Sequence, residues 1–134
     1  KIKNNTFLIK NAKFNKTFIF HNSNDDKKIK FLKSKKVNVV YCPLFKGNLD
    51  FDFIIKDLLK KEIFSILVEG GKSLISSLII GNYFNEFYLF KSSKILKKRG
   101  LLRIKNIQTS LSSKFKNIKF DETFLDKDKL IHYY

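Results

Sequence analysis

The residues with the clearest chemical potential lie in the segment Ile66-Leu-Val-Glu-Gly-Gly-Lys-Ser73. An apolar strand here would hold the carboxylate of Glu69 at its tip, and two glycines would then turn the chain into a helix. Glycine lets a ligand approach the backbone, and free N–H groups at a helix N-terminus attract phosphate. Lys72 and Ser73 add a charge and a hydroxyl, while Glu69 suits N–H or O–H groups of a substrate. The pattern predicts an anion site beside an acid, with a plain tight turn and a solvated Glu69 as an equally weighted alternative.

Nearby patterns are weaker. Residues 71–73 read Gly-Lys-Ser, like the end of a P-loop, but that motif needs a glycine where Ile66 stands, so we reject it. Cys42 precedes Pro43 without a second cysteine or a base nearby, which indicates a buried, inert thiol. A basic run is interpreted as a solvated loop rather than a phosphate clamp; it comprises Lys94, Lys97, Lys98 and Arg99.

The two histidines give little indication of chemistry. His21 ends the first expected strand, at the same sheet edge as Glu69, so a ligand role is conceivable, but a structural role is favoured. His132 lies in the last expected strand with no visible acid or nucleophile partner. Neither histidine is therefore assigned to the site.

Strands and helices alternate along the part of the chain that must position Glu69. Apolar and β-branched runs predict strands at 17–21, 37–41, 64–68 and 84–90, followed by two late strands at 115–120 and 130–134. This order predicts an α/β domain with a mostly parallel sheet, helices on both faces and antiparallel C-terminal strands. In such open sheets ligands bind at the carboxyl ends of strands, which is where Glu69 would lie.

Three helices are expected between these strands. A Ser-x-x-Asp capping box at Ser23 begins a short basic helix that ends before Val37. An apolar stripe at i, i+3, i+4, i+7 and i+8 from Phe51 predicts the second. Leu74, Ile75, Leu78 and Ile79 mark the third, and Gly81 is expected as its C-terminal cap.

Composition excludes several classes of protein. The 134 residues, 43% of them hydrophobic, suit one domain with an apolar core rather than a disordered chain. A single cysteine excludes a disulfide framework and a multi-cysteine metal site, and no apolar run approaches the roughly 20 residues of a membrane span. We therefore expect a cytoplasmic protein without a membrane partner. The net charge of +16 comes mostly from dispersed Lys, with Arg only at Arg99 and Arg103, which favours a solvated surface over nucleic-acid binding.

The surroundings of Glu69 resemble one family in order and spacing. The matching segments are Asn48-Leu-Asp-Phe51, Ile63-Phe-Ser-Ile-Leu-Val-Glu-Gly-Gly71, Leu78-Ile-Ile-Gly-Asn-Tyr-Phe-Asn-Glu-Phe87 and Ser93-Lys-Ile-Leu96. From about Thr17 to its C-terminus the chain is similar to the C-terminal reductase domain of the bacterial bifunctional riboflavin-biosynthesis deaminase/reductase. That domain is related in fold to dihydrofolate reductase.

The resemblance implies an NADPH-dependent reduction of 5-amino-6-(5-phosphoribosylamino)uracil, in which hydride from the nicotinamide C4 reaches C1′ of the ribosyl group and leaves a ribityl chain. It implies that Glu69 contacts the substrate. It also implies that the NADP phosphate lies against the turn and helix start formed by Gly71, Lys72, Ser73, Leu74, Ile75, Ser76 and Ser77. A homodimer is expected because family members tend to pair through their sheets. No catalytic residue and no metal ligand is assigned.

Some positions depart from the family pattern. Asn85 stands where the family has Asp, Ser93 where it has Pro, and Lys97 where it has Gly. The sequence lacks methionine and the family's reductase domain begins earlier, so we expect residues 1–134 to be the C-terminal portion of a single reductase domain. Alone, this portion is expected neither to bind NADPH tightly nor to reduce the substrate. It contains no His-x-Glu or Pro-Cys-x-x-Cys of a zinc deaminase, so both a bifunctional parent and a stand-alone reductase stay open.

Three other functions stay open from the sequence. One is a related NADPH reductase of the same fold that acts on another pyrimidine or pterin. The second is a basic nucleic-acid-binding module, which only the net charge supports, and the third is a non-catalytic α/β scaffold.

Overall fold

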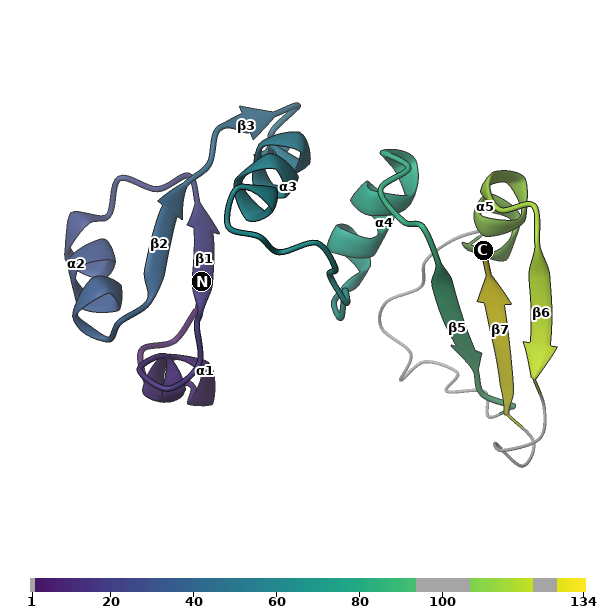
Figure 1. The fold of residues 1–134 in the computed structure, drawn as a ribbon, viewed down its shortest axis with the longest axis horizontal. Coiled ribbons are helices and arrows are strands. Elements are labelled where there is room, and N and C mark those ends of the chain that lie inside the picture. Colours follow the sequence, from purple (N-terminus) through teal and green to yellow (C-terminus); the bar gives the residue numbers. More distant parts are fainter. Residues whose placement is uncertain (1, 94–106, 122–127) are drawn as a thin grey trace, which may run out of the picture. The chain divides into compact units, whose positions relative to one another are not determined.

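The computed structural model describes residues 2–93, 107–121 and 128–134 and divides into two compact units, Lys1–Ile66 and Leu67–Tyr134 (Figure 1). The predicted basic loop, Lys94 to Arg103, lies wholly outside the described residues. No helix within the described residues is both long enough and apolar enough to cross a membrane.

The first unit is built around one parallel strand pair. Strands β1 (Phe18–His21) and β2 (Asn38–Tyr41) pair in parallel, with helix α2 (Asp26–Ser34) between them in the chain. This confirms the first predicted strand–helix–strand unit. A short helix that was not predicted, α1 (Phe7–Asn11), joins α2 in covering the pair, and the shared core consists of Ile9, Ala12, Leu32 and Val37.

The ends of α2 are set by local hydrogen bonds. The predicted cap at Ser23 is wrong, because Asp25 is the N-cap and its carboxylate accepts from the Lys28 N–H at 3.0 Å. The Ser23 hydroxyl instead accepts from the Asp25 N–H at 3.3 Å. At the other end the Val37 N–H donates to the Leu32 carbonyl at 3.2 Å, which closes the helix as predicted before Val37.

A hairpin and a third helix complete this unit. Strands β3 (Leu44–Phe45) and β4 (Asn48–Leu49) form a hairpin that was not predicted. Its turn is of the tight primed type, because Lys46 and Gly47 both have positive φ. Helix α3 (Phe51–Leu59) confirms the second predicted helix, and the Asp50 carboxylate caps it. None of its residues is buried, so its apolar stripe is only partly covered.

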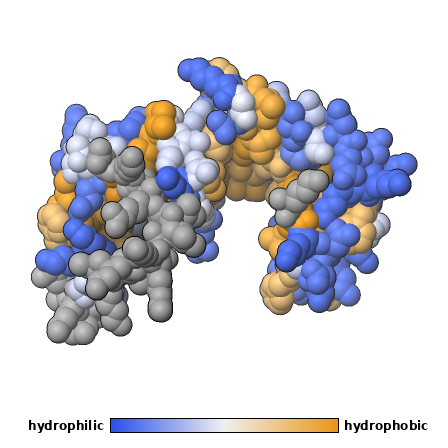
Figure 2. Space-filling view, turned by 180° about the vertical axis from the view of Figure 1, so that it is seen from behind, coloured by the Kyte–Doolittle hydropathy of each residue, from blue (hydrophilic) through white to orange (hydrophobic). Residues whose placement is uncertain are grey.

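The predicted third strand, at 64–68, is wrong. Residues 63–71 form neither helix nor strand, and none of the described strands pairs with them. Phe64 and Leu67 are 80% and 84% exposed. A strand forms only where a neighbour completes its hydrogen-bond ladder, and the boundary between the two units falls inside this run. Figure 2 shows exposed apolar areas of this kind in orange among hydrophilic blue ones.

The second unit is an antiparallel sheet with helices on one face. Helix α4 (Lys72–Ile80), strand β5 (Phe87–Lys91), helix α5 (Ile107–Lys114) and strands β6 (Ile118–Asp121) and β7 (Lys129–Tyr133) follow in chain order. The strand order is β5-β7-β6, with β7 antiparallel to both neighbours (Figure 1). The late antiparallel strands are thus confirmed, whereas α5 was not predicted. Helices α4 and α5 contribute Ile79 and Leu111 to a core shared with Ile131 and Tyr133.

The end of α4 follows the predicted cap. Gly81 is the C-cap, and a Cβ at this position would clash with the Tyr83 ring. The left-handed residue is Asn82, with φ 58°, and the Tyr83 N–H donates to the Leu78 carbonyl at 3.0 Å. Gly81 is therefore required by space rather than by its backbone angles.

Together the described strands form three separate sheets of two, two and three strands. Among the described strands parallel pairing is seen only between β1 and β2, and β5 pairs antiparallel with β7. A single mostly parallel sheet with helices on both faces is not seen among the described residues. Mixed helices and strands, as an α/β protein requires, are confirmed.

Candidate functional site

The predicted site lies at the start of α4, wholly within the unit Leu67–Tyr134. Gly71 is the N-cap of α4 and, having no side chain, makes no capping hydrogen bond. The Ile75 N–H donates to the Gly71 carbonyl at 3.2 Å and so makes the first intrahelical bond. The amides of Lys72, Ser73 and Leu74 therefore precede the helical ladder and have no side-chain cap in the described part of the chain.

The other two nine-residue helices begin differently. Asp25 caps α2, and the Asp50 carboxylate at α3 accepts from the N–H groups of Asp52 and Phe53 at 2.9 and 3.2 Å. In contrast, α4 has no acidic residue in its first turn, and Lys72 there is exposed. Its positive dipole end and its first amides are thus left for an external acceptor.

The two glycines before α4 do not form the expected sharp turn. Among the described glycines only Gly47 has a positive φ, and Gly71 has φ −44° and ψ 164°. A Cβ on Gly70 would meet the Leu74 side chain at an ordinary 3.6 Å, and one on Gly71 would meet nothing within 4 Å. The backbone therefore does not require glycine at Gly71, but the absence of a side chain leaves open space in front of the helix.

Glu69 lies two residues before the N-cap, in a segment that forms neither helix nor strand, and not at the tip of a strand. The prediction that a strand holds Glu69 at its tip is therefore wrong, since residues 63–71 form no strand. The Glu69 side chain is exposed, and no hydrogen bond or ion pair to another described residue engages its carboxylate. The carboxylate of Glu69 is therefore available as an acceptor, and it lies in the segment that leads into the N-terminus of α4, where the open amides are.

The other residues predicted to contact the NADP phosphate, Ile75, Ser76 and Ser77, lie beyond the first three amides of α4. Ile75 packs against the core that contains Ile79, and its amide is already bonded to Gly71. Ser76 and Ser77 are half-buried in the second turn, and the Ser77 carbonyl accepts from the Gly81 N–H at 2.9 Å. The backbone N–H groups without a helical partner thus lie in the first turn. Residues 75–77 contribute to α4 through helical hydrogen bonds and packing.

A polar cluster on the sheet was missed from the sequence. His132 Nε2 lies 3.0 Å from Glu86 Oε2, so the expectation that His132 has no acid partner is wrong. The Tyr88 hydroxyl donates to the same Glu86 oxygen at 3.0 Å, and the Tyr88 and His132 rings stack with centroids 4.2 Å apart. The bond to Glu86, with desolvation and the charge of Glu86, raises the pKa of Tyr88. Only the pairing of β5 with β7 reveals this cluster.

Two other residues considered from the sequence, His21 and Cys42, make contacts that suit a structural role. His21 Nδ1 accepts from the Ser23 N–H at 3.2 Å, and its ring meets Tyr41 edge to face. Cys42 is fully buried, and burial raises the pKa of its thiol, as an inert cysteine requires. Within the described residues no group of three His, Cys, Asp or Glu side chains could hold a metal ion.

Comparison with known protein families gives one match. The family model of the RibD C-terminal domain matches residues 1–123, which includes the whole α4 junction but not β7. The match begins earlier than Thr17, where the resemblance was placed. No curated protein matched the chain. The matched family is the C-terminal reductase domain of RibD, an oxidoreductase-type enzyme domain with a dihydrofolate-reductase-like fold. Because the match covers most of the sequence, the chain belongs to the RibD C-terminal domain family.

Proposed function

We propose that this domain serves in the NADPH-dependent reduction of 5-amino-6-(5-phosphoribosylamino)uracil in riboflavin biosynthesis. Family membership supports a reductase-like role in that pathway. The observation that carries the finer proposal is the uncapped start of α4, with open space at Gly71 and a free acid at Glu69.

The start of α4 fits a phosphate group of NADPH. The amides of Lys72, Ser73 and Leu74 would donate to the phosphate oxygens, and the Ser73 hydroxyl and Lys72 ammonium would add a hydrogen bond and a charge. Each hydrogen bond to a charged group contributes about 1.5–3 kcal/mol. Because Gly71 has no Cβ, the phosphate can approach the backbone from the open side.

Glu69 would bind and orient the substrate. An ionised carboxylate accepts hydrogen bonds only, so it selects N–H or O–H groups on the pyrimidine or the ribosyl chain. Holding those groups in place lowers the entropic cost of bringing C1′ to the reduced cofactor. When bound, NADPH supplies the hydride, while the protein supplies position and electrostatics.

We also propose that the domain acts as a homodimer. The sheet face that α4 and α5 do not cover presents Tyr88, Phe90 and Tyr134, which are 51%, 67% and 48% exposed and could pack against a second copy. Light scattering of the full-length protein should give a dimer mass, and a monomer at micromolar concentration would contradict the proposal.

A substitution at Glu69 tests the proposed function in the full-length protein. Consumption of NADPH, followed by its absorbance, should depend on 5-amino-6-(5-phosphoribosylamino)uracil. Glu69→Gln should raise the substrate KM about tenfold, as loss of one charged hydrogen bond predicts, and leave the NADPH Kd within about twofold. Glu62→Gln, the same change at an exposed acid of the other unit, should change neither constant.

Two outcomes would contradict this assignment. Equal KM values for Glu69→Gln and Glu62→Gln would remove Glu69 from the substrate site. NADPH consumption only with a different pyrimidine or a pterin would instead support a related reductase of the same family.

A further inference from the structure

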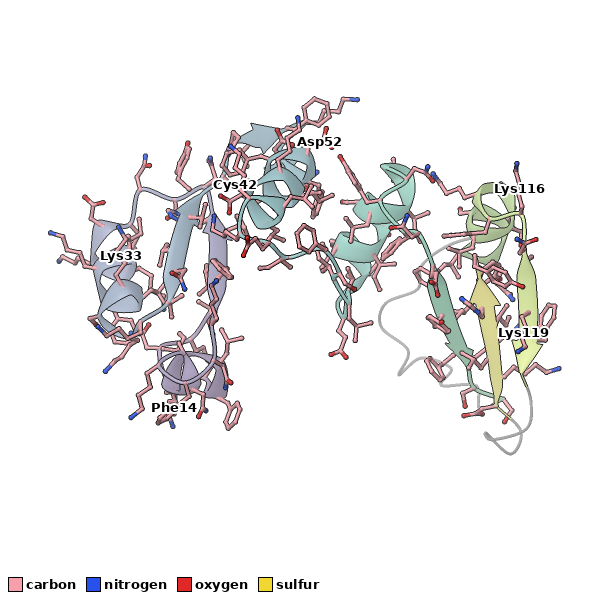
Figure 3. The ribbon with its side chains drawn as sticks, viewed as in Figure 1. Phe14, Lys33, Cys42, Asp52, Lys116 and Lys119 are labelled. Carbon is pink, nitrogen blue, oxygen red and sulfur yellow. The ribbon has the colours of Figure 1, made fainter. Side chains whose placement is uncertain are left out.

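Helix α1 and the turn after it carry exposed aromatic rings that the proposed function does not use. Phe7 and Phe14 are 80% and 74% exposed, and Figure 3 labels Phe14 beside α1. Ile9 and Ala12, which lie between them in the chain, are buried in the core of the first unit. One side of this segment is therefore held in the core, while two rings of the same segment are in contact with solvent.

The spacing of the two rings places them on one side of a helical segment. Phe7, Lys10, Asn11 and Phe14 fall at i, i+3, i+4 and i+7, positions that share a helix face. The Asn15 N–H donates to the Asn11 carbonyl at 2.9 Å, so the helical pattern continues past the end of α1. A rise of 1.5 Å per residue separates the two phenylalanines by about 10.5 Å along the axis, with a lysine and an amide between them.

Hydrogen bonds hold this segment in place. The Asn11 amide donates to the Phe7 carbonyl at 3.0 Å. Just before α1, the Lys28 ammonium of α2 donates to the Ile2 carbonyl at 2.8 Å and to the side-chain oxygen of Asn4. The rings are thus presented from an ordered backbone, which lowers the entropic cost of binding a partner.

Positive charge surrounds the two rings. Residues 1–24 contain five lysines and neither Asp nor Glu. Within the described residues the exposed Lys10 and Lys13 have no ion-pair partner, and Lys13 Nζ lies 4.6 Å from the centroid of the Phe14 ring. Lys16 and Lys36 lie just before β1 and β2, at the same end of the parallel strand pair (Figure 1). We define the α1 patch as Phe7, Lys10, Asn11, Lys13, Phe14 and Lys16.

This composition decides between classes of partner. A helix that binds a membrane surface needs a continuous apolar face that is free to insert, but here Ile9 and Ala12 are buried in the core, and polar side chains separate the exposed rings. In a nucleic-acid duplex the bases stack on one another, which would leave both rings unused. A single strand offers flat bases as well as phosphates, and stacking on an aromatic side chain contributes about 1–3 kcal/mol per base.

We propose that the α1 patch binds single-stranded nucleic acid. Bases stack on Phe7 and Phe14, and the lysines of the patch pair with the phosphates. Because every base has a flat face and every nucleotide a phosphate, this binding tolerates different base sequences. The inference goes beyond the proposed function and does not rest on it, because no residue of the α4 junction takes part.

The probe is a fluorescently labelled oligodeoxythymidine of about 12 nucleotides, titrated with the full-length protein and followed by anisotropy. It should bind at least about fivefold more tightly than its duplex with oligodeoxyadenosine. Phe14→Ala and Phe14→Leu should each weaken binding at least about fivefold, because both remove the ring, and Phe14→Tyr should stay within about twofold of the wild type. The matched control is Phe45→Ala, since Phe45 is 62% exposed and also lies beside a lysine, with Lys46 Nζ 5.3 Å from its ring centroid. This control should stay within about twofold.

The salt dependence of binding tests the phosphate contacts. Lys13→Gln should reduce the slope of log Kd against log salt concentration by about 0.7, as the loss of one phosphate contact on a single strand predicts, and Lys46→Gln should leave the slope unchanged. The absence of oligonucleotide binding at about 50 mM salt would overturn the proposal, as would equal losses in Phe14→Ala and Phe45→Ala. Full binding in Phe14→Leu would overturn base stacking. Binding to phosphatidylserine vesicles but not to the oligonucleotide would overturn the proposal and identify a membrane surface instead.

Discussion

Replacing Gly71 with Asp should move stability and NADPH affinity in opposite directions. The backbone at Gly71 suits an ordinary residue, and an added Cβ would meet nothing within 4 Å. At α3 the Asp50 carboxylate accepts from the two amides two and three residues later. An Asp at position 71 would accept from Ser73 and Leu74 in the same way, and would place a negative charge where we propose the phosphate binds.

The gain in stability follows from the cap. Glycine at an N-cap is only a few tenths of a kcal/mol worse than Asp, and a charge at the dipole end adds about 0.3–1 kcal/mol. The helix, and the unit it belongs to, should therefore gain about 0.5–1 kcal/mol. For a chain of this size the melting temperature rises by about 2–5 °C.

The loss of affinity follows from charge repulsion. Two negative charges about 5 Å apart repel by about 1 kcal/mol in water and about 3 kcal/mol at the effective dielectric of a protein surface. The NADPH Kd should therefore rise by about fivefold to 150-fold from repulsion, and further because the carboxylate also occupies the amides. Gly71→Asn is the matched control, since it caps the helix without the charge and should lose less affinity.

The assay is a fluorescence titration of NADPH into the full-length protein, paired with calorimetric unfolding. Raising the salt concentration should recover part of the affinity of Gly71→Asp but less of that of Gly71→Asn, because salt screens only the charge. Unchanged NADPH affinity in Gly71→Asp would refute the phosphate site at α4. A lowered melting temperature would refute the described geometry of Gly71.

Three further predictions concern stability and titration. Gly81→Ala should cost about 1–3 kcal/mol in urea unfolding, because its Cβ would collide with the Tyr83 ring, and Tyr83→Ala in the same chain should remove most of that cost; equal losses with and without Tyr83 would contradict the clash. Asp50→Ala should cost about 1 kcal/mol by loss of the α3 cap, whereas Asp50→Asn should retain most of the stability in the same assay. Glu86→Gln should lower the pKa of Tyr88 towards its ordinary value in a tyrosinate absorbance titration, since the bond to Glu86 is the main cause that raises it. Because that pKa is raised in the folded state, its stabilising contribution is complete below the unfolded pKa and is lost as pH rises through the folded one. An unchanged titration would show that Glu86 does not hold the Tyr88 proton.

Local patterns predicted the helices well. The apolar stripe from Phe51 and the run from Leu74 correspond to α3 and α4, and Gly81 caps α4 as expected. Helical hydrogen bonds join residues four apart, so a short window of sequence contains nearly all that the helix needs. The short α1 and the weakly apolar α5 were not predicted, because neither sequence shows a clear apolar stripe at helical spacing.

Strand partners could not be predicted in the same way. The run from Phe64 is as apolar as β1, yet it forms no strand among the described residues. The Glu86–His132 pair joins residues 46 apart, and nothing near His132 in the sequence points to its partner. Strand ladders and side-chain contacts of this kind depend on which distant segments meet, and periodicity does not contain that information.

The amino-acid sequence by itself determined the chemical content of the junction at Glu69, the helix that follows it, and the resemblance that the family match bears out. The tertiary structure alone decided that the first amides of α4 are uncapped beside open space, and that Phe7 and Phe14 stay exposed while Ile9 between them is buried. The physical reason is that residue types and helical spacing are local properties of the chain, whereas open space and burial arise only when separate elements pack.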